Sequence, residues 1–149
     1  MPNVLNPFML HALFELPLAL ICFIKPEMWP VTNQTVSSLV SIKMWAITVI
    51  SLSLPSMLAI SMPDTMPGKR AIGLGLMTYH ALFAITFMQL REAPVLEQPS
   101  SKVTAEFTVM VLHTILFLLF ATWWQTSGAK VKALSKELAK NASGSTPTH

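Results

Sequence analysis

Charged residues are scarce in this sequence. Only 11% of its 149 residues are charged and 52% are hydrophobic, whereas an average soluble domain has about 25% charged residues. The mean hydropathy of +0.55 agrees with this composition. Three long segments, residues 44–62, 71–90 and 107–124, contain no Asp, Glu, Lys or Arg. A soluble helical bundle would need polar outer faces on its helices, and no such face occurs here, which argues against a soluble protein.

Motifs that identify common reaction types are also absent. Cys22 is the only cysteine, which rules out an intramolecular disulfide and any paired-cysteine metal or redox motif. The sequence has no glycine-rich phosphate loop, no GxSxG and no HExxH. Sequence motifs therefore assign no metal site, leave the cofactors unknown and favour a non-enzymatic protein.

What the chain does contain is four apolar segments of membrane-spanning length. A bilayer core of roughly 30 Å requires about 20 helical residues. We therefore predict an all-α integral membrane protein, an antiparallel up-down-up-down four-helix bundle within residues 1–128. Ala71 and Gly75 have the small-xxx-small spacing that lets helices approach closely. The helices are expected at about residues 8–24, 42–62, 71–90 and 106–125.

The C-terminal segment, residues 129–149, differs in composition from the rest. Val131, Leu134 and Leu138 share one helical face, and four lysines lie elsewhere around the helix. This pattern predicts a basic amphipathic tail helix attracted to anionic lipid. A solvated continuation of the fourth helix is the alternative interpretation. Residues 141–149 are short, polar and expected to be disordered.

Positive charges and aromatic residues give a topology. Of the ten Lys and Arg residues, six fall on the side of the two termini and four on the other, so the termini are predicted to be cytosolic. Asn33 lies in a glycosylation sequon on the opposite side, and glycan on Asn141 would overturn this topology. We expect an internal membrane such as the endoplasmic reticulum. The expected interfacial anchors are Trp29, Trp45, Trp123 and Trp124.

Four ionisable side chains lie inside the apolar segments: His11, Glu15, His80 and His113. Each needs a reason to be there, because a polar group in hydrocarbon is costly. His11 and Glu15 are spaced i, i+4 on one helix face. Counting helical rise from the membrane edge places Glu15 and His80 at similar depth. The same count makes His11 shallow and interfacial and puts His113 toward the far side.

This intramembrane set is open to several interpretations. Its members could be structural, acting as hydrogen-bonding glue between helices. Histidines from separate helices could converge on a metal, haem or quinone. Glu15 could carry a proton or a cation in a small proton-linked transporter. Finally, a Glu/His pair could serve as acid and base in an enzyme that acts on lipid or sterol.

Short motifs in the first and third segments resemble a known family type. The stretch HALFELP at residues 11–17, followed by Phe23 and Pro26, resembles the first helix of small DoxX-like four-helix membrane proteins, including fungal ones of unknown function. Residues 67–71 with Tyr79 and His80 are similar to their third helix. The resemblance covers about residues 10–89. It implies a four-helix membrane bundle and no particular activity.

Together these observations predict a small multi-pass membrane protein with a non-enzymatic role, an accessory or scaffold subunit. Its expected partners are the lipid bilayer and other membrane proteins or further copies of itself. Nucleic acid is not expected, because the basic residues flank the apolar segments instead of forming a stripe with aromatics. The alternatives are a membrane-embedded enzyme or redox or ligand-binding protein using Glu15, His80 and His113, and a proton-linked transporter.

Overall fold

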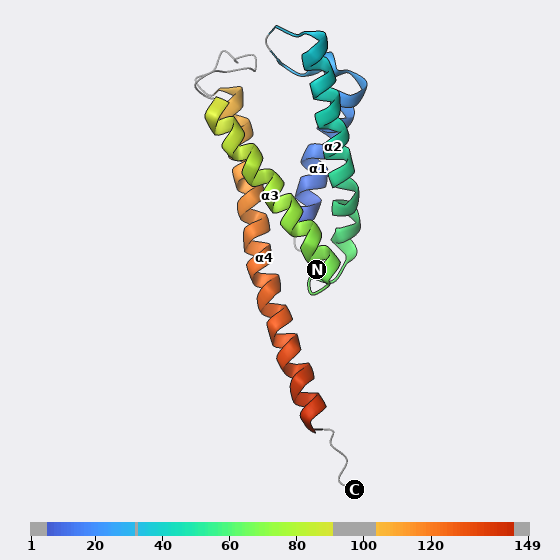
Figure 1. The fold of residues 1–149 in the computed structure, drawn as a ribbon, viewed down its shortest axis with the longest axis vertical. Helices are drawn as coiled ribbons and strands as arrows, with labels where there is room; N and C mark the ends of the chain where they lie inside the picture. The colour runs from blue at the N-terminus through green and yellow to red at the C-terminus, as the bar shows by residue number, and fades with distance from the viewer. Residues whose placement is uncertain (1–5, 32, 91–103, 145–149) are drawn as a thin grey trace.

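The computed structural model of this chain describes residues 6–31, 33–90 and 104–144 (Figure 1). These residues form four long α-helices and one short 3₁₀ helix, and no β-strand occurs within those ranges. The all-α class predicted from the sequence is confirmed. Each long helix is apolar and long enough to cross a membrane. The helices are α1 (Pro7–Ile24), η1 (Pro26–Met28), α2 (Val36–Ser61), α3 (Pro67–Gln89) and α4 (Ala105–Gly144).

Local sequence signals explain where the helices begin. The side chain of Asn6 accepts a hydrogen bond of 3.0 Å from the backbone N–H of Phe8, and Pro7 occupies the first turn of α1. Thr35 and Ser38 form a reciprocal capping box at the start of α2. This cap explains why α2 begins at Val36 instead of near residue 42.

The C-terminal part of the chain continues α4 without interruption. The fourth helix was expected to end near residue 125, but it runs to Gly144 and carries the basic segment with it (Figure 1). Lysine, alanine and leucine, all strong helix formers, dominate this part and no proline interrupts it. The geometry therefore corresponds to the extended fourth helix and not to a separate tail helix. Residues 145–149 lie outside the described part of the chain.

The helices pack mainly as two pairs, α1 with α2 and α3 with α4. Successive helices alternate in direction in Figure 1, and α4 extends well beyond the others. Small side chains such as Ala19 and Ala46 fill one buried cluster between α1 and α2. A second cluster joins all four helices and contains Phe8, Ala59, Leu76 and Phe120.

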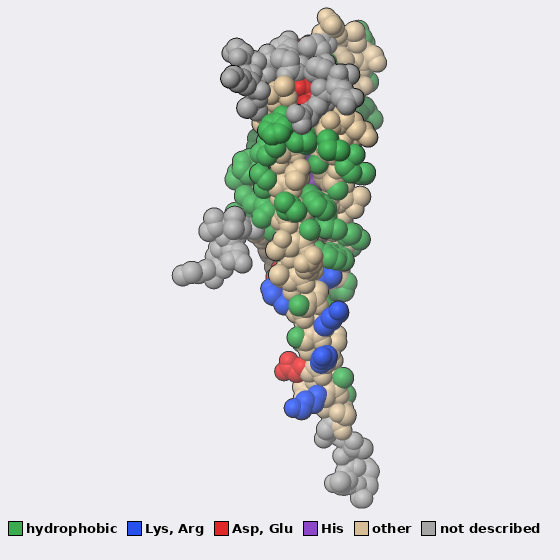
Figure 2. Space-filling model, turned by 90° about the vertical axis from the view of Figure 1, so that its left-hand side faces the viewer, with side chains coloured by type: hydrophobic (Ala, Val, Ile, Leu, Met, Phe, Trp, Pro, Cys, Tyr) green, Lys and Arg blue, Asp and Glu red, His purple; other side chains and the backbone are tan. Residues whose placement is uncertain are grey.

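Outside these clusters, much of the apolar surface is uncovered. Leu13, Phe14, Leu58 and Leu82 are all more than half exposed. Figure 2 shows hydrophobic side chains gathered on the upper part of the molecule and Lys and Arg on the narrow lower part. Large exposed apolar surfaces are rare on soluble monomers. The surface is therefore compatible with insertion into a membrane.

Glycine permits a close helix contact at one position of α3. A Cβ atom at Gly73 would overlap the ring carbon Cζ3 of Trp123, whereas a Cβ at Gly75 would meet nothing within 4 Å. The Trp123 ring has little room to shift, because it packs edge-on to Phe8 at a centroid distance of 4.8 Å and is hydrogen-bonded to Asp64. The close approach of α3 to α4 thus depends on Gly73, and not on Gly75 as its spacing from Ala71 suggested.

Replacing these two glycines by alanine should have opposite effects on stability. We expect Gly73→Ala to lower the free energy of unfolding by about 1 to 3 kcal/mol, the usual cost of overpacking. Gly75→Ala should be neutral or stabilising by up to about 1 kcal/mol, because alanine is the better helix former. Thermal unfolding of both variants in the same detergent measures the difference. Equal stability of the two variants would contradict the contact at Gly73.

Candidate functional site

The structure brings together all four ionisable residues of the apolar segments. His11 and Glu15 come from α1, His80 from α3 and His113 from α4, and all four are buried. The contact expected between Glu15 and His80 is present, at 3.4 Å between Oε1 and Nδ1. The shallow, interfacial position expected for His11 stays a prediction. Its side chain is fully buried against His80, because the start of α1 packs between the other helices.

The imidazole rings form a continuous chain across the molecule. Nδ1 of His11 lies 3.2 Å from Nε2 of His80. Nδ1 of His80 lies 2.9 Å from Nδ1 of His113. On the other side of His11, its Nε2 lies 3.5 Å from the hydroxyl of Ser53 on α2. Each of the four helices therefore contributes one member of this chain.

Glu15 lies beside the histidine chain, with its carboxylate within ion-pair distance of three imidazole nitrogens. Only 7% of the residue is exposed, and neither oxygen has a hydrogen-bond partner among the described residues. The nearest nitrogens are Nδ1 of His11 at 3.7 Å, of His80 at 3.4 Å and of His113 at 3.7 Å. A buried carboxylate that makes no hydrogen bond is costly. The arrangement therefore favours a positive ion or a proton between these groups.

Three of the donor atoms have the spacing of a metal site. Nδ1 of His80, Nδ1 of His113 and Oε1 of Glu15 form a triangle with sides of 2.9, 3.4 and 3.7 Å. Ligands about 2.0–2.1 Å from a tetrahedral ion lie about 3.3 Å from each other. A small movement would therefore let all three bind one ion. Donor atoms of His11, Glu15 and His80 also lie within 4.8 Å of one another.

His11 has the position of an outer partner to this triangle. Metal-binding histidines commonly use one ring nitrogen for the ion and the other for an orienting hydrogen bond. His80 directs Nδ1 toward Glu15 and His113 and Nε2 toward His11. His11 would thus fix the orientation of the His80 ring, and Ser53 would fix that of His11.

Three further residues near the site carried no sequence signal of a polar role. Ser53 is buried. The hydroxyl of Tyr79 is also buried and lies beside Glu15 and the buried indole nitrogen of Trp45. The Tyr79 ring lies 5.8 Å from that of His113 and 6.2 Å from that of His11, centroid to centroid. These side chains lie near the site because of the way the helices pack, and the local sequence does not predict that packing.

An apolar cavity of about 170 Å³ borders the site. Glu15 and His113 form part of its wall, and Trp29 and Trp45 contribute aromatic surface. These two tryptophans were expected at the membrane interface, but their rings pack together at 5.2 Å and face the cavity. Their interfacial role stays a prediction.

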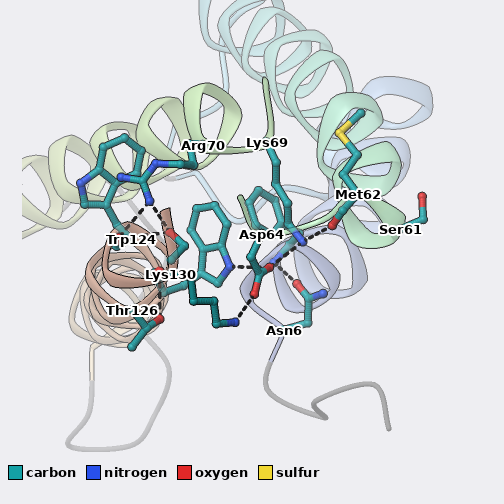
Figure 3. Close-up of polar contacts among 12 residues, drawn as sticks. Asn6, Ser61, Met62, Asp64, Lys69, Arg70, Trp124, Thr126 and Lys130 are labelled. Carbon is teal, nitrogen blue, oxygen red and sulfur yellow. Dashed lines mark hydrogen bonds and ion pairs between the residues drawn. The ribbon is translucent and has the colours of Figure 1, made fainter. Parts of the chain in front are cut away.

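A second polar cluster, around Asp64, ties the α2–α3 connection to α4 (Figure 3). Oδ1 of Asp64 accepts hydrogen bonds from Nζ of Lys69 at 3.0 Å and from Nε1 of Trp123 at 3.2 Å. Oδ2 accepts from Nζ of Lys130 at 2.7 Å. Lys69 also donates to the carbonyl of Met62 at 2.8 Å. These contacts hold the end of α2 and the start of α3 against α4.

The neighbouring Arg70 contacts the same middle part of α4. Its guanidinium lies over the Trp124 ring, 4.0 Å from the centroid, and donates to the Trp124 carbonyl and the Ser127 hydroxyl. Trp123 and Trp124 were expected as interfacial anchors, and both are half-buried in these contacts. Asn33, the expected glycosylation site, is exposed between η1 and α2 with a positive φ of 53°.

The Asp64 cluster predicts a pH-dependent stability. The hydrogen bond from Lys130, followed by those from Lys69 and Trp123, lowers the pKa of Asp64 from 3.8 to about 2 against an opposing effect of burial. Because the folded pKa is depressed, the cluster stabilises the protein fully above about pH 4 and loses this contribution as the pH falls through about 2. We expect the unfolding temperatures of the wild type and Asp64→Asn to differ at pH 6 and to converge near pH 2.

The exposed Glu137 on α4 supplies the control for that measurement. Glu137→Gln changes charge by the same amount but touches no part of the Asp64 cluster. Its unfolding temperature should follow that of the wild type at pH 6. A difference between wild type and Asp64→Asn that persists undiminished at pH 2 would refute the predicted linkage.

No family model, no curated protein and no solved structure matches this chain. The resemblance of residues 11–17 and of Tyr79 and His80 to DoxX-like proteins therefore stays a prediction.

Proposed function

We propose that this protein spans an internal membrane as an antiparallel four-helix bundle with both termini in the cytosol. Four apolar helices and a largely exposed apolar surface support membrane insertion. Lys69, Arg70 and Lys130 gather at the end of the molecule where α4 emerges, which supports a cytosolic position for that end. The endoplasmic reticulum is the membrane expected from the sequence.

Within the membrane, we infer that the protein binds one divalent transition-metal ion. The observation that carries this inference is the triangle of His80, His113 and Glu15, in which the buried carboxylate makes no hydrogen bond to the described residues. Two histidines and one carboxylate are the protein ligands of catalytic zinc sites and of non-haem iron sites, both of which keep a position open. The mean of the three distances between these donor atoms is close to the distance between two ligand atoms of a tetrahedral ion. This favours Zn²⁺ over Fe²⁺.

Metal analysis of the purified protein tests this function. The full chain, in detergent or lipid nanodiscs, would be incubated with ZnCl₂, or with Fe²⁺ under anaerobic conditions, and then dialysed. We expect about one retained zinc ion per chain by mass spectrometry of the metal. Co²⁺ in place of zinc should give the intense visible absorption of a tetrahedral site. A folded protein that retains no ion would overturn the proposal.

The other functions considered from the sequence receive less support from the geometry. The chain from Ser53 through His11 and His80 to His113 takes one residue from each helix, so it runs across the helices and not along them. Such a direction does not favour proton movement from one side of a membrane to the other. The accessory or scaffold role stays a prediction, and a metal-free protein would favour it.

A further inference from the structure

The cavity beside the metal-ligand triangle has features of a binding site for a lipid-soluble molecule. Its volume is about 170 Å³, and a cavity of about 150 Å³ in a protein core is large enough to hold benzene. Aromatic side chains form much of its wall: Phe14, Trp29, Trp45, Phe83 and Phe87. A single six-membered ring therefore fits its size and its surface.

The cavity lies toward the outer surface of the helices. It runs between α1 and α4, which contact each other far less than α1 contacts α2 or α3 contacts α4. Phe14 on α1 and Leu112 on α4 line it and are themselves largely exposed. In a membrane these two residues would face acyl chains, so a ligand could arrive from the bilayer.

The cavity wall includes a buried hydrogen-bond acceptor. Glu15 lines the cavity, is more than nine-tenths buried and has no hydrogen-bond partner at either oxygen among the described residues. His113 lies beside it, with Nδ1 3.7 Å from Oε1. A carboxylate needs a donor, so the matching group on a ligand is a hydroxyl and not an ether or a plain hydrocarbon.

We propose that this cavity binds a phenol-headed lipid, with the ring between the aromatic side chains, the hydroxyl at Glu15 and His113, and the hydrocarbon chain between α1 and α4. The inference rests on the proposed metal-binding function, because the same two side chains would place the hydroxyl at the open position of the ion. The inference adds to that function the chemical class of the ligand that would reach the open position of the ion. The lipid phase supplies the ligand, so no aqueous channel is required.

Competition binding with matched small molecules tests the proposal. The full chain in nanodiscs would be loaded with zinc and incubated with radiolabelled 4-octylphenol. Unlabelled 4-octylphenol, its methyl ether and octylbenzene would then compete for binding. Hydrogen bonds to a charged group contribute enough to change affinity by about tenfold or more. We therefore expect the phenol to compete at least about tenfold better than the ether or octylbenzene. Equal competition by all three would overturn the proposal.

Two tryptophan substitutions on α4 locate the binding. Leu112→Trp places a large ring at the mouth of the cavity, whereas Leu118 is similarly exposed on the same helix and does not line the cavity. We expect Leu112→Trp to weaken 4-octylphenol binding by at least about tenfold, because the larger ring would occupy part of the space that the ligand needs. Leu118→Trp should leave the binding unchanged. Unaltered binding to a folded Leu112→Trp protein would contradict the assigned cavity.

The metal content of each sample separates this proposal from the function on which it rests. Retained zinc with no preference for the phenol over its ether would leave the metal site standing and refute the phenol-headed ligand. Preferential phenol binding by a protein that retains no zinc would refute the metal site and support binding by Glu15 and His113 alone. Both measurements use the same purified protein.

Discussion

Glu15→Gln and His80→Ala are expected to lower the affinity for Zn²⁺ by at least about 100-fold. Substitution of an outer-shell partner typically costs 10- to 100-fold in metal affinity, and these residues would bind the ion directly. Oε1 of Glu15 and Nδ1 of His80 form one side of the triangle, 3.4 Å long. Competition with a chromogenic zinc chelator would measure the affinity of each purified variant.

Matched substitutions distinguish metal binding from structural hydrogen bonding. Glu137→Gln makes the same chemical change at an exposed position and should bind zinc like the wild type. His11→Gln should have a smaller effect of about 10- to 100-fold, because His11 contacts Nε2 of His80 from outside the triangle. If Glu15→Gln and His80→Ala lower the unfolding temperature while zinc affinity is unchanged, the buried polar residues of the site serve only to stabilise helix packing.

Phe8→Ala should cause one of the largest losses of stability of any single substitution in this chain. Phe8 is fully buried and meets Phe120 and Trp123 edge-on, at centroid distances of 5.2 and 4.8 Å. Truncation of a buried phenylalanine typically costs about 3 to 5 kcal/mol. We expect a value near the lower end, because lipid would surround the separated helices in the proposed membrane location and the transfer from water would contribute less.

Phe14→Ala provides the control on the same helix. Phe14 is 60% exposed and contributes to the cavity wall, so its truncation should cost well under 1 kcal/mol of stability. Reversible unfolding in mixed micelles with increasing sodium dodecyl sulfate would compare the two variants. Similar costs for Phe8→Ala and Phe14→Ala would show that the cluster of Phe8, Phe120 and Trp123 does not stabilise the fold.

Much of the helical architecture could be predicted from the sequence because length and apolarity are local properties. The predicted and observed bounds agree closely for α1, which begins at Pro7 after its Asn6 cap. The start of α2 differed because the capping box of Thr35 and Ser38 outweighs the polar character of the residues that follow. The end of α4 differed because helix propensity continues after the apolar segment has ended.

The candidate site could be predicted only in part. The i, i+4 spacing places His11 and Glu15 on one face, and their side chains are 3.7 Å apart. Depth along a helix axis suggested the contact between Glu15 and His80 but not the contacts of His11 and His113 with His80. A count of helical rise treats all helices as parallel to one axis and ignores how far each slides against its neighbours. The convergence of His11, His80 and His113 depends on this sliding.

Contacts between distant parts of the chain carried no local signal. Asp64 meets Lys130 and Trp123 across more than fifty residues of sequence. Gly73 and Gly75 look equivalent in the sequence, yet only Gly73 faces the Trp123 ring. Each of these depends on the rotation of one helix about its own axis relative to another, and a weakly amphipathic helix does not specify that rotation.

The length of α4 has a mechanical consequence. At 1.5 Å per residue its 40 residues span about 60 Å, roughly twice the thickness of a bilayer core. One rigid helix therefore contains both the buried His113 and the exposed, lysine-bearing segment. Arg70 and Asp64 contact the helix between these two parts. A force on the exposed segment would reach His113 directly, with no loop in between to absorb it.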